Sequence, residues 1–235
     1  MNTTIALLHS PLVSAATWGS VPNELATLGL DVAVPEVLDD DEPPFAARYV
    51  ARASLQLAQE LPGQPLVLVG HSGAGPLLPQ ISFARHAAGV PVRGYVFLDA
   101  MLPRVPQATT RLELLSLEDA AFATSLSEVL SAGGRFPDWS EADLAESLPD
   151  PADRALVLAG LRPRQLDFFT EPLPAPEDWP DARCGYIQLS AAYDKPAATA
   201  KRRGWNVRAA DLHHFAALTH PASIAKLLVQ TLGEL

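Results

Sequence analysis

The stretch LVLVGHSGAGPLL, residues 66–78, constrains the fold more than any other part of this sequence. A short apolar run is followed by Gly-His-Ser-Gly-Ala-Gly and then by a second apolar run that can begin a helix. Continuous apolar runs of this kind are typical of parallel strands that are covered on both faces. Ser72 is therefore expected where a buried strand turns sharply into a helix, between glycines that keep the turn narrow.

Short β-rich segments alternate with longer helical patterns along most of the chain. The patterns predict strands at residues 3–9, 30–37, 65–70, 92–100, 184–190 and 205–211. They predict helices at residues 17–28, 45–60, 77–88 and 222–232. This alternation predicts the α/β class, with a mostly parallel open sheet of about six strands flanked by helices.

Residues 104–180 break this rhythm, because they contain short helical patterns but no predicted strand. An insertion after the fourth strand would lie over the carboxyl ends of the strands, where open α/β sheets bind ligands. We therefore predict a single domain over residues 1–235, with a core of residues 1–103 and 181–235. The inserted residues, about 104–180, are predicted to form a helical lid. A further helix layer without a gating role is the alternative.

Charge and hydropathy limit the partners of this chain. The net charge of −10 and the pI of about 5.0 argue against binding to nucleic acid or to an anionic membrane surface. No apolar run approaches the roughly 18 residues of a membrane span. The N-terminal segment has no basic region before its apolar run, so we predict no signal peptide and a cytoplasmic location. The expected partner is a small-molecule substrate, and the oligomeric state stays open.

Cysteine and lysine usage add two further expectations. Cys184 is the only cysteine, which excludes an intrachain disulfide and a cysteine-based metal site. We expect neither a metal nor a cofactor. Lysine accounts for three of the 17 basic residues, and alanine is abundant, a composition typical of a GC-rich bacterial genome.

In this strand-turn-helix setting, G-x-S-x-G is the signature of a nucleophile elbow. The serine of such an elbow has a strained backbone, so the residues two positions away have to be small. Gly70 meets this requirement, and Ala74 stands in place of the second glycine. The elbow would present the Ser72 hydroxyl at the top of the sheet and point the Gly73 N–H at an anion. The alternatives are a glycine turn without chemistry and a phosphate-binding loop, which lacks its usual spacing here.

Five segments together resemble the α/β-hydrolase superfamily. They are LLHSPLVSAATW, VLVGHSGAG, YVFLDAMLP, QLSAAYD and DLHHFAALTHP, in the order of that family and across the chain outside the insertion. The resemblance implies a parallel sheet with an inserted cap. It also implies a serine hydrolase of the esterase or lipase type, without a cofactor.

A serine hydroxyl needs a neighbouring base that takes its proton. His213 and His214 are the best candidates, because they follow the last predicted strand. The family has a His-aromatic pair seven residues before a proline that begins the final helix. His214, Phe215 and Pro221 reproduce this spacing, so the resemblance favours His214. His71, within the elbow, is expected to point away from the reaction centre.

A carboxylate should fix the tautomer of this histidine. Asp194 follows the fifth predicted strand and occupies the usual position of the acid in the family. Asp99 ends the fourth predicted strand, a position used by some members, certain haloalkane dehalogenases among them. Both carboxylates are at the carboxyl ends of strands, so both could reach the same imidazole. Asp194 is preferred, and Asp99 is the alternative.

Acyl transfer needs two hydrogen-bond donors for the developing oxyanion. The Gly73 N–H would be one. The resemblance places the other two residues after His9, where this chain has Pro11, which carries no N–H. The Leu12 N–H or the Ser10 hydroxyl could replace it. Alternatively, the enzyme is slow or specialised for a reactive substrate, or its reaction has no tetrahedral oxyanion.

These residues predict a serine hydrolase that cleaves a small apolar ester, thioester or lactone. Ser72 would attack, His214 would act as base and then acid, and Asp194 or Asp99 would orient His214. One alternative is a lyase, cyclase or isomerase of the same fold that uses the Ser72–His214 pair. The other is a non-catalytic protein that binds a ligand in the same site.

Overall fold

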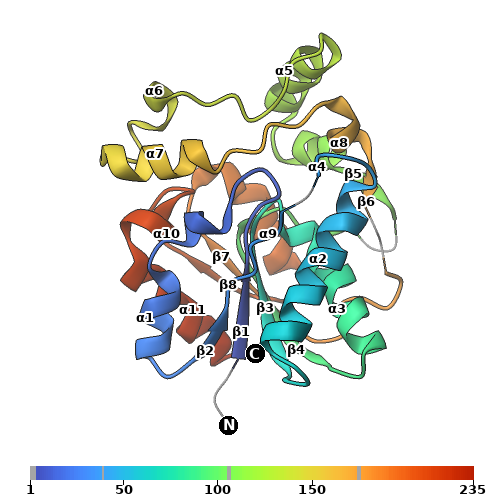
Figure 1. Ribbon diagram of the computed structural model, residues 1–235, viewed down its shortest axis with the longest axis vertical. Coiled ribbons are helices and arrows are strands. Elements are labelled where there is room, and N and C mark those ends of the chain that lie inside the picture. Colours follow the sequence, from blue (N-terminus) through green and yellow to red (C-terminus); the bar gives the residue numbers. More distant parts are fainter. Residues whose placement is uncertain (1–3, 39, 105–106, 174–175) are drawn as a thin grey trace.

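The computed structural model describes residues 4–38, 40–104, 107–173 and 176–235 (Figure 1). Residue 3 of the first expected strand and residues 105–106 and 174–175 of the expected lid lie outside these ranges. Six of the described strands form one sheet in the order β2-β1-β3-β4-β7-β8, and all of its pairings are parallel. The predicted α/β sheet of about six strands is therefore confirmed. These strands are β1 (Thr4–Leu8), β2 (Asp31–Ala33), β3 (Leu66–Ser72), β4 (Val92–Ala100), β7 (Arg183–Gln188) and β8 (Asn206–Ala209).

Helices cover both faces of the sheet (Figure 1). They are α1 (Val21–Thr27), α2 (Phe45–Glu60), α3 (Leu78–Ala87), α9 (Asp194–Arg202), α10 (Ala216–Thr219) and α11 (Pro221–Leu232). Shorter 3₁₀ helices lie at Ala15–Trp18, Gly75–Leu77 and Ala191–Tyr193.

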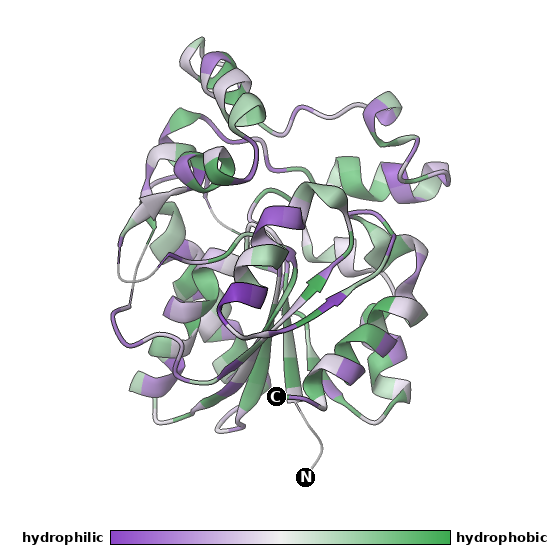
Figure 2. Cartoon of the chain, turned by 180° about the vertical axis from the view of Figure 1, so that it is seen from behind, coloured by the Kyte–Doolittle hydropathy of each residue, from purple (hydrophilic) through white to green (hydrophobic). Residues whose placement is uncertain are grey.

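Two apolar clusters form the core, one on each face of the sheet. Ala6 and Leu8 of β1 belong to the cluster that α2, α3 and α9 cover. Ile5 and Leu7 belong to the cluster that α1 and α11 cover. Side chains alternate between the two faces of a strand, so a strand that is apolar throughout must be covered on both. Figure 2 shows the strands as largely hydrophobic and the helices as mixed.

The ends of several elements differ from the sequence-based prediction. The strand expected at residues 30–37 is paired only over Asp31–Ala33. Pro35 lies two residues after the end of β2, and a residue without an N–H cannot continue the ladder of this edge strand. The helix expected at residues 17–28 is split into the 3₁₀ helix at Ala15–Trp18 and α1. Pro221 occupies the first turn of α11, where a missing N–H costs no hydrogen bond.

In the described parts of the chain between β4 and β7, five short helices lie above the carboxyl ends of the strands (Figure 1). A two-stranded antiparallel sheet, which the sequence analysis did not predict, joins the two ends of this inserted segment. A role as a lid stays a prediction. The elements are α4 (Arg111–Glu118), α5 (Ala120–Ser131), α6 (Glu141–Leu144), α7 (Pro151–Ala159), α8 (Leu166–Thr170), β5 (Thr109–Thr110) and β6 (Pro172–Leu173).

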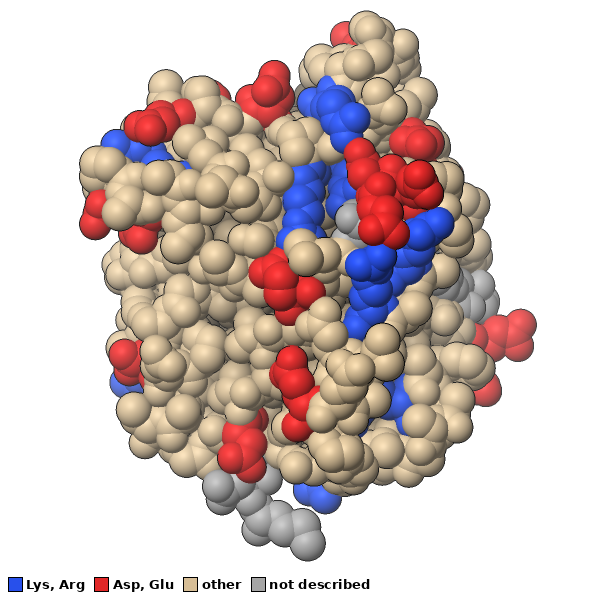
Figure 3. Space-filling model, viewed as in Figure 1, with Lys and Arg blue, Asp and Glu red and all other residues tan. Residues whose placement is uncertain are grey.

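On the face in Figure 3, acidic side chains are spread widely, and basic ones lie among them. Within the ranges that the structure covers, no helix has the length and apolarity that crossing a membrane would require.

Candidate active site

Ser72 ends β3 with a φ of 56°, in the left-handed region that side chains other than glycine rarely adopt. Two glycines make room for this turn. A Cβ atom on Gly75 would lie 2.1 Å from the carbonyl oxygen of Met101. A Cβ atom on Gly70 would lie 3.0 Å from the side chain of Leu78. The turn therefore has the strained, tightly packed geometry of an elbow, and Gly75 is the glycine that packs against β4.

A bulge in β4 lies directly beside this elbow. The register between β3 and β4 shifts next to Ser72, which pairs with Ala100, so Asp99 is an extra residue in β4. Asp99 has a φ of 43°, also in the left-handed region. The Tyr186 hydroxyl accepts a hydrogen bond from the Ala100 N–H (3.2 Å) and donates one to the Ala100 carbonyl (2.9 Å). Bulges commonly redirect a side chain, and this one places the Asp99 carboxylate near His214.

The carboxylate of Asp99 is fully buried and fully hydrogen-bonded. Its Oδ2 accepts from His214 Nδ1 (2.8 Å) and from the Ser190 hydroxyl (2.7 Å). Its Oδ1 accepts from the backbone N–H groups of Leu189 (2.8 Å) and Ser190 (3.1 Å). Burial alone would raise the pKa of Asp99, but these hydrogen bonds and the charge of His214 outweigh it and lower the pKa below its usual value. Asp99 therefore stays ionised and can hold His214 in one tautomer.

Asp194 lies elsewhere. It is exposed at the start of α9 and accepts a hydrogen bond from the side chain of Gln188. Of the two carboxylates that the sequence left open, Asp99 is the one that contacts His214.

Two further histidines lie close to His214. The ring of His71 lies 4.4 Å from the ring of His214, and the His71 Nε2–H donates to the His214 carbonyl oxygen at 3.0 Å. His71 was expected to point away from the reaction centre, but it packs against the candidate base. Burial, helped by the nearby His214, lowers the pKa of His71 to about 3, so His71 stays neutral. His213 instead forms a hydrogen bond with Thr219 (2.8 Å).

Tyr193 contacts both Ser72 and His214. Its hydroxyl lies 3.3 Å from the Ser72 Oγ, within hydrogen-bond distance. Its ring stacks on the His214 ring with centroids 5.1 Å apart and an angle of 6°. Among the residues that the structure describes, the Ser72 hydroxyl is hydrogen-bonded to Tyr193 and not to His214. Tyr193 was not predicted from the sequence, and its place directly before Asp194 was the available signal.

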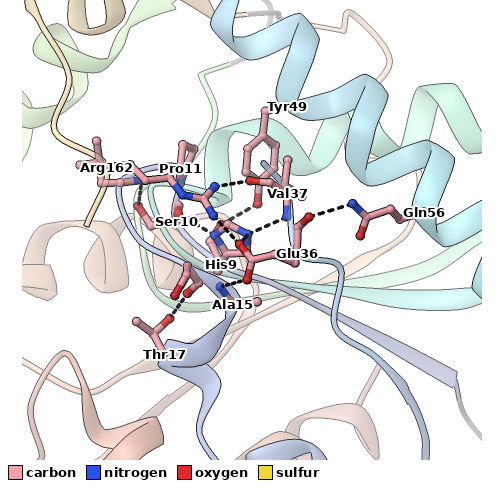
Figure 4. Close-up of polar contacts among 12 residues, drawn as sticks. His9, Ser10, Pro11, Ala15, Thr17, Glu36, Val37, Tyr49, Gln56 and Arg162 are labelled. Carbon is pink, nitrogen blue, oxygen red and sulfur yellow. Dashed lines mark hydrogen bonds and ion pairs between the residues drawn. The ribbon is translucent and has the colours of Figure 1, made fainter. Parts of the chain in front are cut away.

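The loop after β1 is held in place by buried hydrogen bonds (Figure 4). The His9 Nδ1–H donates to the Ser10 carbonyl (2.8 Å), and His9 Nε2 accepts from the Val37 N–H (3.0 Å). The Tyr49 hydroxyl donates to the His9 carbonyl at 2.5 Å. Burial lowers the pKa of His9, which keeps the ring neutral and able to accept the bond from Val37.

The inserted segment also binds this loop. The Arg162 N–H donates to the Leu12 carbonyl at 2.9 Å, and the Arg162 guanidinium pairs with Glu36 (Figure 4). The buried Arg164 side chain donates to the Pro11 carbonyl at 3.4 Å. The position of the loop therefore depends on residues far away in the sequence.

The same loop faces the elbow at Gly73. The Cδ of Pro11 lies 3.5 Å, and the Oγ of Ser10 lies 3.0 Å, from the point that a Cβ on Gly73 would occupy. In proline, Cδ replaces the hydrogen of the backbone N–H. The ring of Pro11 thus fills the place where a donor would point toward the elbow. The Leu12 N–H donates to Ser10 Oγ at 3.3 Å, which leaves the hydroxyl hydrogen of Ser10 able to donate elsewhere.

A cavity of about 510 Å³ opens above Ser72 and His214. The inserted segment supplies most of its aromatic wall, so the cavity suits a small and largely apolar molecule. In the described ranges, no cluster of three or more His, Cys, Asp or Glu side chains is placed to hold a metal ion. The aromatic side chains that line the cavity are Phe122, Phe136, Trp139, Phe168, Phe169, Tyr193 and Phe215.

Three residues with guanidinium or carboxyl side chains also line the cavity. Arg111 pairs with Glu171 at 3.5 Å. Asp119 caps α5 by accepting the Phe122 N–H at 3.0 Å. Burial, and repulsion from the Asp99 carboxylate, raise the pKa of the Glu118 carboxyl to about 8. Glu118 therefore carries a proton at neutral pH and offers a polar group in an apolar cavity.

Replacing Glu118 with glutamine should change how stability depends on pH. The pKa of Glu118 is higher in the folded than in the unfolded chain, so the folded state binds more protons between about pH 4.5 and 8. As the pH rises through this range, the free energy of unfolding of the wild type should therefore fall by about 1–2 kcal/mol relative to that of Glu118→Gln. Urea unfolding at pH 5, 7 and 9 measures the difference. The same difference in unfolding free energy between the two proteins at all three pH values would contradict this prediction.

Comparisons with known proteins agree with this fold. The model of the alpha/beta hydrolase family matches residues 5–227. An extracellular alpha/beta-hydrolase from a Paenibacillus species, described as sharing structural and functional homology with tobacco salicylic acid binding protein 2, is 16% identical. It has a TM-score of 0.77, and the match covers 97% of this chain and 98% of that one. A sequence search of curated proteins gives no match.

Two plant structures are also similar. Tomato methylketone synthase I in complex with 2-tridecanone is 16% identical with a TM-score of 0.71, covering 100% of this chain and 99% of that one. A methylesterase protein from Arabidopsis is 14% identical with a TM-score of 0.68, covering 99% of this chain and 100% of that one. At these identities the likeness establishes the fold, and the neighbours differ in activity.

Proposed function

The chain belongs to the alpha/beta hydrolase family, and on this premise we propose that it is a serine hydrolase acting on a small, largely apolar ester, thioester or lactone. The observation that carries the proposal is the 2.8 Å contact between His214 Nδ1 and the buried Asp99 carboxylate, beside a serine on a strained turn. The apolar cavity of about 510 Å³ above these residues supports the substrate class. The likeness to a methylesterase agrees with it.

In the first step, Ser72 Oγ attacks the carbonyl carbon of the ester and His214 Nε2 takes its proton. The Ser72 hydroxyl first has to leave its hydrogen bond with Tyr193 and turn to His214. Catalytic hydrogen bonds are often loose before substrate binds, so this rotation is compatible with the role. The two electrons of the carbonyl π bond move to its oxygen, and Asp99 stabilises the imidazolium that forms.

In the second step, the tetrahedral intermediate collapses and the alcohol leaves with the proton from His214, so Ser72 is acylated. Water then attacks the acyl-enzyme while His214 takes one of its protons. Collapse of this second intermediate releases the acid and returns the proton to Ser72 Oγ. Asp99 stays ionised throughout, consistent with its lowered pKa.

We assign the two oxyanion donors to the Gly73 N–H and the Ser10 hydroxyl. The Ser10 Oγ lies close to Gly73, and it already accepts the Leu12 N–H. The hydroxyl hydrogen of Ser10 can therefore point at the substrate, whereas the N–H of Leu12 is already hydrogen-bonded to Ser10 Oγ. Of the two replacements considered for the missing Pro11 donor, Ser10 is the better placed.

Ser10→Ala should lower kcat/KM by about 10²-fold, the usual effect of losing one oxyanion donor. Adding Pro11→Ala to this variant should recover part of the loss, because an N–H would replace the Cδ that faces Gly73. Steady-state hydrolysis of p-nitrophenyl butyrate by the wild type and the single and double variants tests this. Full activity of Ser10→Ala alone would rule out the Ser10 hydroxyl as a donor.

A second candidate is a non-hydrolytic enzyme, such as a lyase, cyclase or isomerase, that uses Ser72 and His214 only for proton transfer. The ring of Pro11 at the expected donor position favours it, since such reactions need no tetrahedral oxyanion. The similarity to methylketone synthase I fits the same possibility. Elimination or isomerisation activity together with negligible ester hydrolysis would select this candidate over the first.

We also propose that the inserted segment acts as a lid over the site and that the rest of the chain forms the core of the same domain. Its aromatic residues line the cavity, and its Arg162 and Arg164 bind the loop that carries Ser10. A cytoplasmic location and a bacterial origin remain predictions from the sequence. The similar Paenibacillus protein is described as extracellular.

A further inference from the structure

We propose that Tyr193 is a catalytic residue whose hydroxyl donates a hydrogen bond to the alcohol oxygen of the ester as that oxygen leaves. This inference rests on the proposed hydrolase function. It makes esters of aliphatic alcohols the substrates that gain most from this site, because an aliphatic alkoxide is a poor leaving group that needs stabilisation.

The position of Tyr193 is the first argument. Its hydroxyl lies 3.3 Å from the nucleophilic Ser72 Oγ, and its ring lies almost parallel to the His214 ring, 5.1 Å away. In the tetrahedral intermediate, the leaving oxygen and Ser72 Oγ are bonded to the same carbon. A donor that reaches Ser72 Oγ in the free enzyme therefore needs only a small shift to reach the leaving oxygen.

The two sides of Ser72 have different roles. Gly73 of the elbow and Ser10 of the loop after β1 lie close together and are suited to the carbonyl oxygen. Tyr193 stacks on His214, which delivers the proton to the leaving alcohol. The hydroxyl of Tyr193 is therefore suited to the leaving oxygen rather than to the oxyanion.

The surroundings of Tyr193 keep its hydroxyl protonated. Burial raises the pKa of the phenol and outweighs the opposite effect of the Ser72 hydrogen bond. The Asp99 carboxylate, and Glu118 once it loses its proton above about pH 8, raise the pKa of Tyr193 further. Tyr193 thus remains a donor over the working pH range and gives up no proton. The proton that the alcohol acquires comes from His214, and Tyr193 contributes a hydrogen bond that strengthens as charge develops on the leaving oxygen.

The position of the acid explains why a tyrosine can lie here. The carboxylate that contacts His214 comes from the bulge in β4. The 3₁₀ helix Ala191–Tyr193 after β7 is therefore not needed to supply it. A phenylalanine would preserve the stacking on His214. Stacking alone therefore does not account for the hydroxyl group of Tyr193.

The test is the leaving-group dependence of Tyr193→Phe. Ethyl butyrate and p-nitrophenyl butyrate share one acyl group but differ in the basicity of the leaving oxygen. Tyr193→Phe should lower kcat/KM for ethyl butyrate by about tenfold or more, the value of one hydrogen bond of roughly 1.4 kcal/mol. The loss for p-nitrophenyl butyrate should stay below about threefold, because p-nitrophenolate needs little stabilisation.

Each other outcome has one interpretation. An equal loss for both esters would show that Tyr193 only positions His214, and no loss for either would show that its hydroxyl is not used. Both results would overturn the proposal while leaving the hydrolase function intact. A wild type that hydrolyses neither ester, and whose Ser72 is not labelled by a fluorophosphonate probe, would instead overturn the proposed function and the role of Tyr193 with it.

Discussion

Replacing Ser72 with alanine should lower the hydrolysis of p-nitrophenyl acetate by about 10⁴- to 10⁶-fold, because it removes the oxygen that attacks the substrate. Within residues 70–75, which contain the strained turn, Ser72 carries the only hydroxyl group. The residual rate should come only from binding and from the oxyanion donors. A fluorophosphonate probe should label the wild type and leave the variant unlabelled.

This comparison also separates an enzyme from a binding protein of the same fold. The alanine side chain is smaller than serine and causes no new contact, so the variant should unfold at a denaturant concentration close to that of the wild type. Turnover that persists in a folded Ser72→Ala protein, with no labelling of the wild type, would exclude the acyl-enzyme mechanism. Saturable ligand binding without any turnover in either protein would select the binding role.

The second large effect is expected at Asp99. Asp99→Asn should lower kcat by about 10³- to 10⁴-fold, because the amide no longer holds His214 in the tautomer that accepts the Ser72 proton. Asparagine tolerates the positive φ of this position, so the bulge itself should survive. Asp194→Asn is the matched control and should change kcat by less than about threefold, since Asp194 is exposed and contacts Gln188 instead.

Steady-state kinetics of the two variants, with circular dichroism to confirm folding, decides between the carboxylates. Equal losses in both would mean that neither aspartate alone orients the histidine. A large loss in Asp194→Asn with an active Asp99→Asn would assign the acid to the position after β7, against the contact between Asp99 and His214 in the structure.

The parts of the fold that the sequence predicted are those that local patterns determine. Short runs of a few residues predict the buried strands and the glycine-rich turn at Ser72, and each is present in the structure. The end of β2 was predicted too late, because the apolar residues continue past Pro35 although the hydrogen bonding cannot. The small sheet of β5 and β6 was missed, since strands of two residues leave no periodic pattern.

The choice between Asp99 and Asp194 depends on information that a single sequence does not contain. Both lie at or just after the carboxyl end of a strand, at the same edge of the sheet, so their spacing does not distinguish them. The contact of Asp99 with His214 follows from a register shift between β3 and β4, which involves two segments about 30 residues apart. The place of Tyr193 has the same origin, because its neighbours Ser72 and His214 come from other strands and loops.

The aromatic wall of the cavity could not be predicted for a related reason. The inserted segment packs its phenylalanines against one another, with Phe136 in edge contact with Phe122 and Phe169. These residues are spread over loops and short helices, so no periodicity identifies them as one surface.

The extra residue in β4 also determines how the acid could be moved within this fold by protein engineering. In a regular strand, neighbouring side chains alternate between the two faces of the sheet. In a relative whose β4 lacks the bulge, an aspartate substituted at the matching position would therefore point to one face of the sheet. A working transplant would need an insertion of one residue, together with a tyrosine like Tyr186 that satisfies the displaced backbone. The position of the acid in this chain therefore depends on the length of β4 as well as on the identity of residue 99.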